Sequence, residues 1–160
     1  MSYRYSLERR ISGVTGPSLC WLMLNPSTAD AVNDDPTIRK VCGFTRRAGY
    51  GAAVVVNLFA WRATDPRDLR KELARAEGTR NRNAVLSAAA RSDAVVCAWG
   101  ATPWARAQAQ RVLGWLEAHP EKRVRLLHLG AAKAGAPLHP LMLAYAAHPL
   151  VPFGVRAPLW

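Results

Sequence analysis

Four short apolar runs divide the chain into alternating segments. Residues 18–24 (SLCWLML) and 52–57 (AAVVVN) are apolar almost throughout, and residues 93–99 and 124–129 have the same character. Unbroken apolar runs of this length are typical of strands that are buried on both faces of a sheet. The pattern therefore predicts four buried β-strands, separated by segments long enough to hold helices.

Helix-start signals occur in those separating segments. In Asp35-Pro36 and Asp65-Pro66 an N-cap residue precedes a proline at the first helical position, and Thr102-Pro103 has the same form. They predict helices over 36–48, 66–76 and 103–118, and apolar spacing adds helices over 80–91 and 141–147. Strands alternating with helices favour a three-layer α/β fold with a central four-stranded, mostly parallel sheet. We expect one domain over 1–160, with 1–15 and 149–160 peripheral.

The charge of the chain indicates its partner. Its 160 residues include 22 Lys plus Arg against 11 Asp plus Glu, a net charge of +11, and most of the basic residues are arginine. Guanidinium groups bind phosphates in a bidentate manner, and a basic domain is the usual footprint of a nucleic-acid binder. A genome rich in G and C explains the arginine but not the net charge. We therefore expect a nucleic acid or a nucleotide as the partner.

Several classes of protein are disfavoured. Three scattered cysteines (Cys20, Cys42 and Cys97) without a CxxC pair support neither a disulfide framework nor a zinc site. The charged start, MSYRYSLERR, has no apolar signal-peptide core, and no apolar run is long enough to span a bilayer. The glycine motifs of P-loop and dinucleotide-binding proteins are missing. We expect a cytoplasmic monomer without membrane contact, cofactor or metal.

Polar residues gather where the predicted strands end. Ligands of parallel sheets bind at the carboxyl ends of the strands, which here carry Asn25-Pro26-Ser27, Asn57, Trp99-Gly100 and the 130–140 loop with Lys133 and His139. Asn25 either orients a water or ends its strand in an Asx-turn. Asn57 either holds a loop or recognises a ligand. The loop from Asn25 to Asp30 is the strongest candidate for the working site.

Other residues near these ends have two interpretations each. Phe59 is either a core residue or a platform on which a base stacks, and Arg62 is a plausible phosphate contact. His139 is suited to stabilise a developing anion. Three carboxylates, those of Asp30, Asp34 and Asp35, leave open a metal-dependent nuclease or phosphohydrolase, although Asp35 is also a good N-cap.

Long motifs carry a family resemblance. The strings LNPSTADAVNDDPTIRKVCGFTRRAGYG, VVVNLFAWRATDPRDL, AWG and KAGAPLHPLML resemble domain-of-unknown-function family 1643, an uncharacterised bacterial and phage family, from Tyr3-Arg4-Tyr5 to about residue 144. More distantly, the order of the strand-end motifs is similar to the uracil-DNA glycosylase superfamily. Asn25-Pro26-Ser27 is similar to its GINPG turn, Asn57 to its base-reading Asn, and His139-Pro140-Leu141 to its HPSP loop, with Ser27 and Leu141 as departures.

The resemblance implies a uracil-DNA-glycosylase-like fold and hydrolysis of the N-glycosidic bond of a flipped base in DNA. In that case Asn25 holds the attacking water with help from Asp30, and His139 stabilises the leaving base. Asn57 reads the edge of the base, Phe59 or Phe44 stacks on its face, and Pro26 and Ser27 border it, while Arg62 and Lys133 hold phosphates. The departures point to a modified base, for example in phage DNA. The alternatives are a non-catalytic nucleotide-binding module and the metal-dependent hydrolase.

Overall fold

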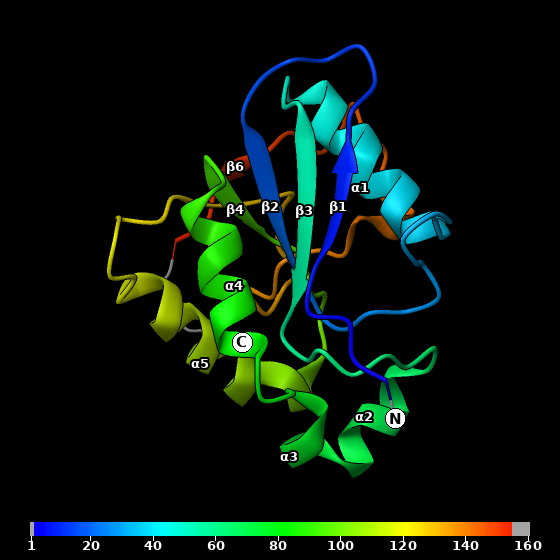
Figure 1. Cartoon of the computed structure of the whole chain (residues 1–160), viewed down its shortest axis with the longest axis vertical. Coiled ribbons are helices and arrows are strands. Elements are labelled where there is room, and N and C mark those ends of the chain that lie inside the picture. Colours follow the sequence, from blue (N-terminus) through cyan, green and yellow to red (C-terminus); the bar gives the residue numbers. More distant parts are fainter. Residues whose placement is uncertain (1, 155–160) are drawn as a thin grey trace.

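The computed structural model describes residues 2–154 and has an α/β architecture on one six-stranded mixed sheet (Figure 1). The strands lie in the order β1-β3-β2-β4-β5-β6. The four central strands β3, β2, β4 and β5 run parallel to one another, and β1 and β6 are antiparallel to their neighbours. The strands are β1 (Leu7–Arg10), β2 (Ser18–Met23), β3 (Ala52–Asn57), β4 (Ala94–Cys97), β5 (Leu126–His128) and β6 (Val151–Pro152).

The prediction of a four-stranded sheet is therefore incomplete. The four expected strands are present and parallel, and β1 and β6 extend the sheet at its two edges. Neither edge strand has a continuous apolar run, because an edge strand covered on one face needs only alternate apolar residues. In β1, Leu7 is buried while Glu8 and Arg10 are exposed, and β6 is two residues long and includes a proline.

Helices cover both faces of the sheet. α1 packs on one face, and α4 and α5 pack on the other, so that side chains of each central strand alternate between two buried clusters. None of the helices in residues 2–154 is long and apolar enough to cross a membrane. The helices are α1 (Pro36–Arg47), α2 (Pro66–Lys71), α3 (Leu73–Ala76), α4 (Asn81–Ala90) and α5 (Arg106–Glu117), with 3-10 turns η1 (Pro103–Ala105) and η2 (Pro140–Met142).

Two helix predictions need correction. The expected 66–76 helix is divided at Glu72, whose backbone leaves the helical region with φ −136° and ψ 41°. The expected 141–147 helix is wrong, because only the short turn η2 forms there. Lys40 of α1 donates a hydrogen bond of 2.7 Å to the Leu143 carbonyl, and Tyr145 packs edge-on against Phe44 at 4.7 Å. These tertiary contacts hold the segment in short turns in spite of its helical composition.

The α1 side of the core contains one buried polar chain. Trp21 is fully buried in β2, and its Nε1 donates to Thr45 Oγ1 at 2.9 Å. Thr45 in turn donates to the Val41 carbonyl at 2.7 Å. Both polar groups are therefore satisfied inside the core, which fixes α1 over the centre of the sheet.

Hydrogen bonding continues beyond the central strands. The Leu58 and Phe59 amides donate to the Met23 and Leu24 carbonyls, and the Ala98 amide donates to the Leu22 carbonyl. The segments that leave β2, β3 and β4 are thus held side by side at the carboxyl edge of the sheet. Polar residues at these strand ends consequently share one location.

We expect Thr45→Val to lower the free energy of unfolding by about 1–3 kcal/mol, because it leaves the buried Trp21 N–H without an acceptor. Urea denaturation monitored by tryptophan fluorescence measures this change. Thr79→Val removes an exposed hydroxyl and should change the stability by less than about 0.5 kcal/mol. Equal effects of the two substitutions would show that the Trp21–Thr45 hydrogen bond contributes nothing.

Candidate functional site

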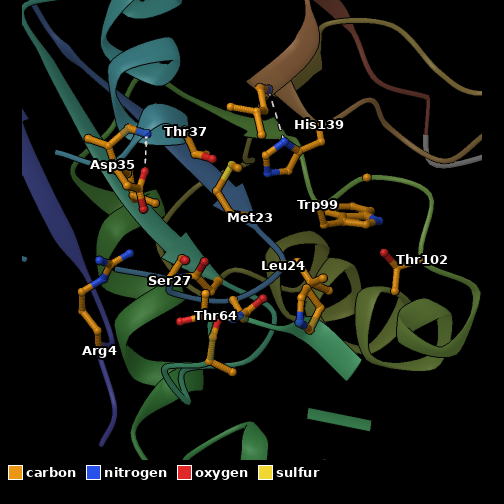
Figure 2. A pocket seen from close by; sticks show the side chains of 18 of the residues that line it. Arg4, Met23, Leu24, Ser27, Asp35, Thr37, Thr64, Trp99, Thr102 and His139 are labelled. Atoms are coloured by element: carbon orange, nitrogen blue, oxygen red, sulfur yellow. Dashed lines mark hydrogen bonds between the residues drawn. The ribbon is translucent and has the colours of Figure 1, made fainter. Parts of the chain in front are cut away.

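A cavity of about 470 Å³ lies at the carboxyl ends of β2, β3 and β4 (Figure 2). Its volume falls within the range of about 300–1,000 Å³ that is usual for small-molecule sites. Its walls come from the three strand ends, the N-terminal segment, the 27–38 loop and first turn of α1, the 63–66 segment and the His139 loop. The polar and aromatic residues that line it are Arg4, Asn25, Ser27, Asp35, Thr37, Asn57, Thr64, Trp99, Thr102 and His139.

Asn57 is the most unusual polar group of this cavity. It is the last residue of β3, opposite Met23 of β2, and only 1 % of its surface is exposed. Neither Nδ2 nor Oδ1 has a hydrogen-bond partner among the described residues. A buried amide left in this state costs about 1–3 kcal/mol for each unsatisfied group. A ligand edge with an adjacent donor and acceptor would satisfy both atoms.

A second asparagine holds the end of β3 in place. Asn81 of α4 is buried, and its Nδ2 donates to the Asn57 carbonyl at 2.9 Å and to the Leu58 carbonyl at 3.1 Å. Gln108 of α5 adds a hydrogen bond of 3.0 Å to the same Leu58 carbonyl. The backbone that presents Asn57 is therefore fixed from two helices. No local pattern in the sequence indicates this role, because both helices lie far from Asn57 along the chain.

His139 lies on the opposite side of the cavity from Arg4 and Ser27 (Figure 2). Its Nδ1 accepts a hydrogen bond of 3.2 Å from the Leu141 amide, so the neutral ring carries its proton on Nε2. Burial lowers the pKa of His139 below its ordinary value of 6.5, and the charge of Asp35 acts in the other direction. His139 is thus a neutral hydrogen-bond donor near pH 7.

The turn after β4 lets the His139 loop come close. Gly100 has φ +80°, and a Cβ on it would lie 3.3 Å from the His139 Cβ. A side chain at this position would both strain the backbone and crowd the histidine. Trp99 beside it contributes an aromatic wall to the cavity. The predicted Trp99-Gly100 strand end therefore shapes the side of the site that His139 occupies.

Asn25 is oriented by its own loop. Its Nδ2 donates to the Pro26 carbonyl at 2.9 Å and to the Ala63 carbonyl at 2.8 Å. Both amide hydrogens are therefore engaged, and the side chain can offer a ligand or a water only its Oδ1 acceptor. The Ala63 amide returns a hydrogen bond to the Pro26 carbonyl, which ties the 25–27 turn to the segment after β3.

The three loop carboxylates have structural partners. Asp30 is partly buried and lies outside the cavity lining, and hydrogen bonds from the Asn33 and Val32 amides lower its pKa to about 2. It is therefore a poor proton acceptor and is not placed to assist a water in the cavity. Asp34 pairs with Arg9 at 2.7 Å. Asp35 lines the cavity and caps α1 by accepting from the Ile38 amide at 2.8 Å.

Several other predicted site residues also lie outside the cavity lining. Phe59 and Phe44 are core residues: Phe59 packs against Trp104 at 5.8 Å, and Phe44 lies between Trp21 and Tyr145. The residues from the prediction that do line it are Asn25, Ser27, Asn57 and His139, while Pro26, Phe44, Phe59, Arg62, Lys133 and Asp30 do not. Within residues 2–154, no group of three His, Cys, Asp or Glu side chains is arranged to hold a metal ion.

Sequence reasoning missed Arg4, which we assigned to a peripheral segment. Its guanidinium borders the cavity and donates to the Ala29 carbonyl. Thr37 and Thr64 were also missed, although both neighbour the Asp-Pro caps that the sequence made visible. No local pattern distinguishes Arg4 from the other arginines of the chain.

Comparison with known proteins identifies a family to which the chain is similar. A family model described as "Protein of unknown function (DUF1643)" matches residues 4–141. Neither the curated proteins nor the solved structures include a match to the chain.

We expect Asn57→Leu to raise the free energy of unfolding by about 1–3 kcal/mol, because it replaces an unsatisfied buried amide by an apolar group of similar size. Asn81→Leu should lower it by a similar amount, because the Asn57 carbonyl then loses this side-chain donor and the Leu58 carbonyl keeps only the one from Gln108. Denaturant unfolding of the two variants provides the comparison. A destabilised Asn57→Leu protein would mean that the amide already has a partner in solution.

For His139 we expect a pKa below 6.5 and a proton on Nε2 in a ¹⁵N-edited NMR titration. Since the folded pKa is the lower one, the contribution of His139 to stability is complete above pH 6.5. It is lost as the pH falls from 6.5 through the folded pKa. The wild type should therefore lose stability relative to His139→Gln over that window. A titration at or above 6.5 would contradict the assignment.

Proposed function

The chain belongs to the DUF1643 family, whose description assigns no activity, and we propose that its cavity binds a nucleobase and that the protein is a DNA glycosylase. In this proposal it hydrolyses the N-glycosidic bond of a flipped, modified base in DNA, on a uracil-DNA-glycosylase-like parallel sheet. The observation that carries the proposal is the meeting of Asn57, His139 and Asn25 in one cavity.

Asn57 supplies the recognition. Its unpartnered donor and acceptor are adjacent and buried, which suits the amide-like edge that nucleobases present. The Trp99 side chain offers an aromatic wall on which a flat ring can pack. Apolar ligands would leave the amide unsatisfied, so the site favours planar heterocycles with alternating donors and acceptors.

His139 and Asn25 supply the chemistry. In hydrolysis, the oxygen of a water bonds to the sugar C1′, the C1′–N bond breaks, and its electron pair leaves with the base. The neutral His139 Nε2–H can donate to an oxygen of the base, where this charge gathers, and Asn25 Oδ1 can accept a hydrogen bond from the water. The water's second proton passes to solvent, and the departing base takes one up.

DNA binding remains part of the proposal because of the net charge of +11. Arg62 and Lys133 lie outside the cavity lining, so in this proposal they contact backbone phosphates rather than the base. Such contacts position a duplex without reading its sequence. The choice of base then rests on Asn57 and the walls around it.

One observation favours a second candidate, a binding module that recognises a base without cleaving it. Asp35 is the one carboxylate among the described lining residues, and backbone amides donate to both of its oxygens. The cavity therefore has no carboxylate devoted to activating water. The same recognition by Asn57 would serve a non-catalytic reader of modified bases.

We expect the wild-type protein to release bases from oligonucleotides that carry deoxyuridine, deoxyinosine or 5-hydroxymethylpyrimidines, tested one at a time. Hot alkali then cleaves the abasic sites. His139→Ala and Asn25→Ala should each reduce the rate about 10²- to 10³-fold, because each removes a group that acts on the transition state. Asn57→Ala should weaken binding of the base.

Asn83→Ala, which changes an exposed asparagine of α4, is the matched control and should keep the wild-type rate. Full activity in His139→Ala and Asn25→Ala would refute the assignment of the catalytic groups. Asn57-dependent binding without abasic sites would establish the binding module instead.

A further inference from the structure

Three arginines converge on the backbone at residues 29 and 30. Arg4 Nη1 and Arg62 Nη2 both donate to the Ala29 carbonyl, the second at 3.3 Å. Arg9 donates to the neighbouring Asp30 carbonyl at 2.5 Å. They come from the start of the chain and from the segment after β3, and they meet at the loop that carries Asn25 and Ser27.

The three differ in how their charges are balanced. Arg9 forms an ion pair with Asp34 at 2.7 Å. Among the described residues, neither Arg4 nor Arg62 forms an ion pair with a carboxylate. Burial and the nearby charge of Arg62 lower the pKa of Arg4, with Asp35 acting in the other direction. Two cations thus share one neutral carbonyl oxygen, and an anion between or beside them would offset their repulsion.

The surroundings of Arg4 on the cavity side suit such an anion. Figure 2 shows the Arg4 head group pointing toward Ser27, with Thr64 on the same wall. Asp35 also faces this corner, but its oxygens accept hydrogen bonds from the Ala29 amide in the loop and from the Ile38 amide in the first turn of α1. These donors and the helix N-terminus stabilise its negative charge. The Arg4 Nε is sealed from solvent without a partner, so the guanidinium is held at the cavity wall rather than in water.

We propose that Arg4, supported by Arg62 and by the hydroxyls of Ser27 and Thr64, forms a phosphate subsite of the cavity. This inference rests on the proposed base recognition by Asn57. Together, the two sites bind a nucleobase and a phosphate of the same nucleotide. The phosphate is either the monoester of a free nucleotide or a diester of a polynucleotide. Arg4 selects for nucleotides over nucleosides, and Asn57 selects the base.

The first test uses inorganic phosphate alone, so that it does not depend on which base is bound. Titration of the ¹⁵N-labelled protein should move the backbone amide resonances of Ser27 and Thr64 in a saturable way. Chloride at the same ionic strength should not. Arg4→Gln should abolish the response, Arg62→Gln should weaken it, and Asn57→Ala should leave it unchanged. Arg70→Gln, which removes an exposed arginine of α2, is the matched control and should bind phosphate normally.

The second test uses the nucleosides of the modified bases proposed above, namely deoxyuridine, deoxyinosine and the 5-hydroxymethylpyrimidine deoxynucleosides. It compares them by calorimetry with their 5′-monophosphates and with the methyl esters of those phosphates. If only the monophosphate binds more tightly than the nucleoside, the natural ligand is a free nucleotide. If the methyl ester binds as tightly as the monophosphate, the natural ligand is a polynucleotide. Arg4→Gln should weaken the binding of phosphate-bearing ligands about ten- to a hundred-fold, as expected for the loss of charge-assisted hydrogen bonds. It should leave the affinity for nucleosides unchanged.

The phosphate subsite is wrong if inorganic phosphate gives no Arg4-dependent response. It is also wrong if Arg4→Gln weakens the binding of nucleosides and of nucleotides equally. In that case Arg4 would only support the 25–30 loop. Arg4-dependent phosphate binding together with no binding of any nucleoside would uphold the subsite and overturn the proposed base recognition.

Discussion

The parallel pairing of β2 with β3 is the constraint on which the site depends. Met23 lies opposite Asn57 at the ends of these strands, and backbone hydrogen bonds continue the pairing through Leu24 and Phe59. Because the chain must cross over through α1 to pair the strands in parallel, both carboxyl ends meet at one edge of the sheet. β4 adds its own end to that edge. The cavity is the space that remains between these ends and the loops that leave them.

Around the cavity, the protein holds several polar groups in fixed positions. Asn57 is buried without a partner, while Asn81 and Gln108 fix the backbone beside it. His139 is held in one tautomer by the Leu141 amide. Groups fixed in this way need little reorganisation when a ligand binds, which is the usual physical basis of strong recognition and of transition-state stabilisation. The local cost in stability is offset by the large apolar core on both faces of the sheet.

The sequence predicted the strand ends that border the cavity better than the other residues that line it. Asn25, Asn57 and His139 could be placed together because each follows a predicted strand, and strand ends of a parallel sheet share an edge. Phe44 and Phe59 were candidates for stacking, yet both point into the core, because proximity to a strand end does not say to which side a ring turns. Asp30 lies on the predicted loop but outside the cavity lining, and its carboxylate accepts hydrogen bonds from the Val32 and Asn33 amides of its own turn.

The apolar runs and the Asp-Pro caps by themselves determined the four central strands, α1 and the edge of the sheet at which polar residues gather. These features depend on burial and capping over a few neighbouring residues, which a local pattern records. Only the tertiary structure decided the two edge strands, the loss of the helix over 141–147 and the presence of Arg4 in the cavity. Each of these rests on contacts between distant segments, such as Lys40 with Leu143 and Arg4 with Ala29. The energy of such contacts depends on which surfaces meet, and no local sequence pattern contains that information.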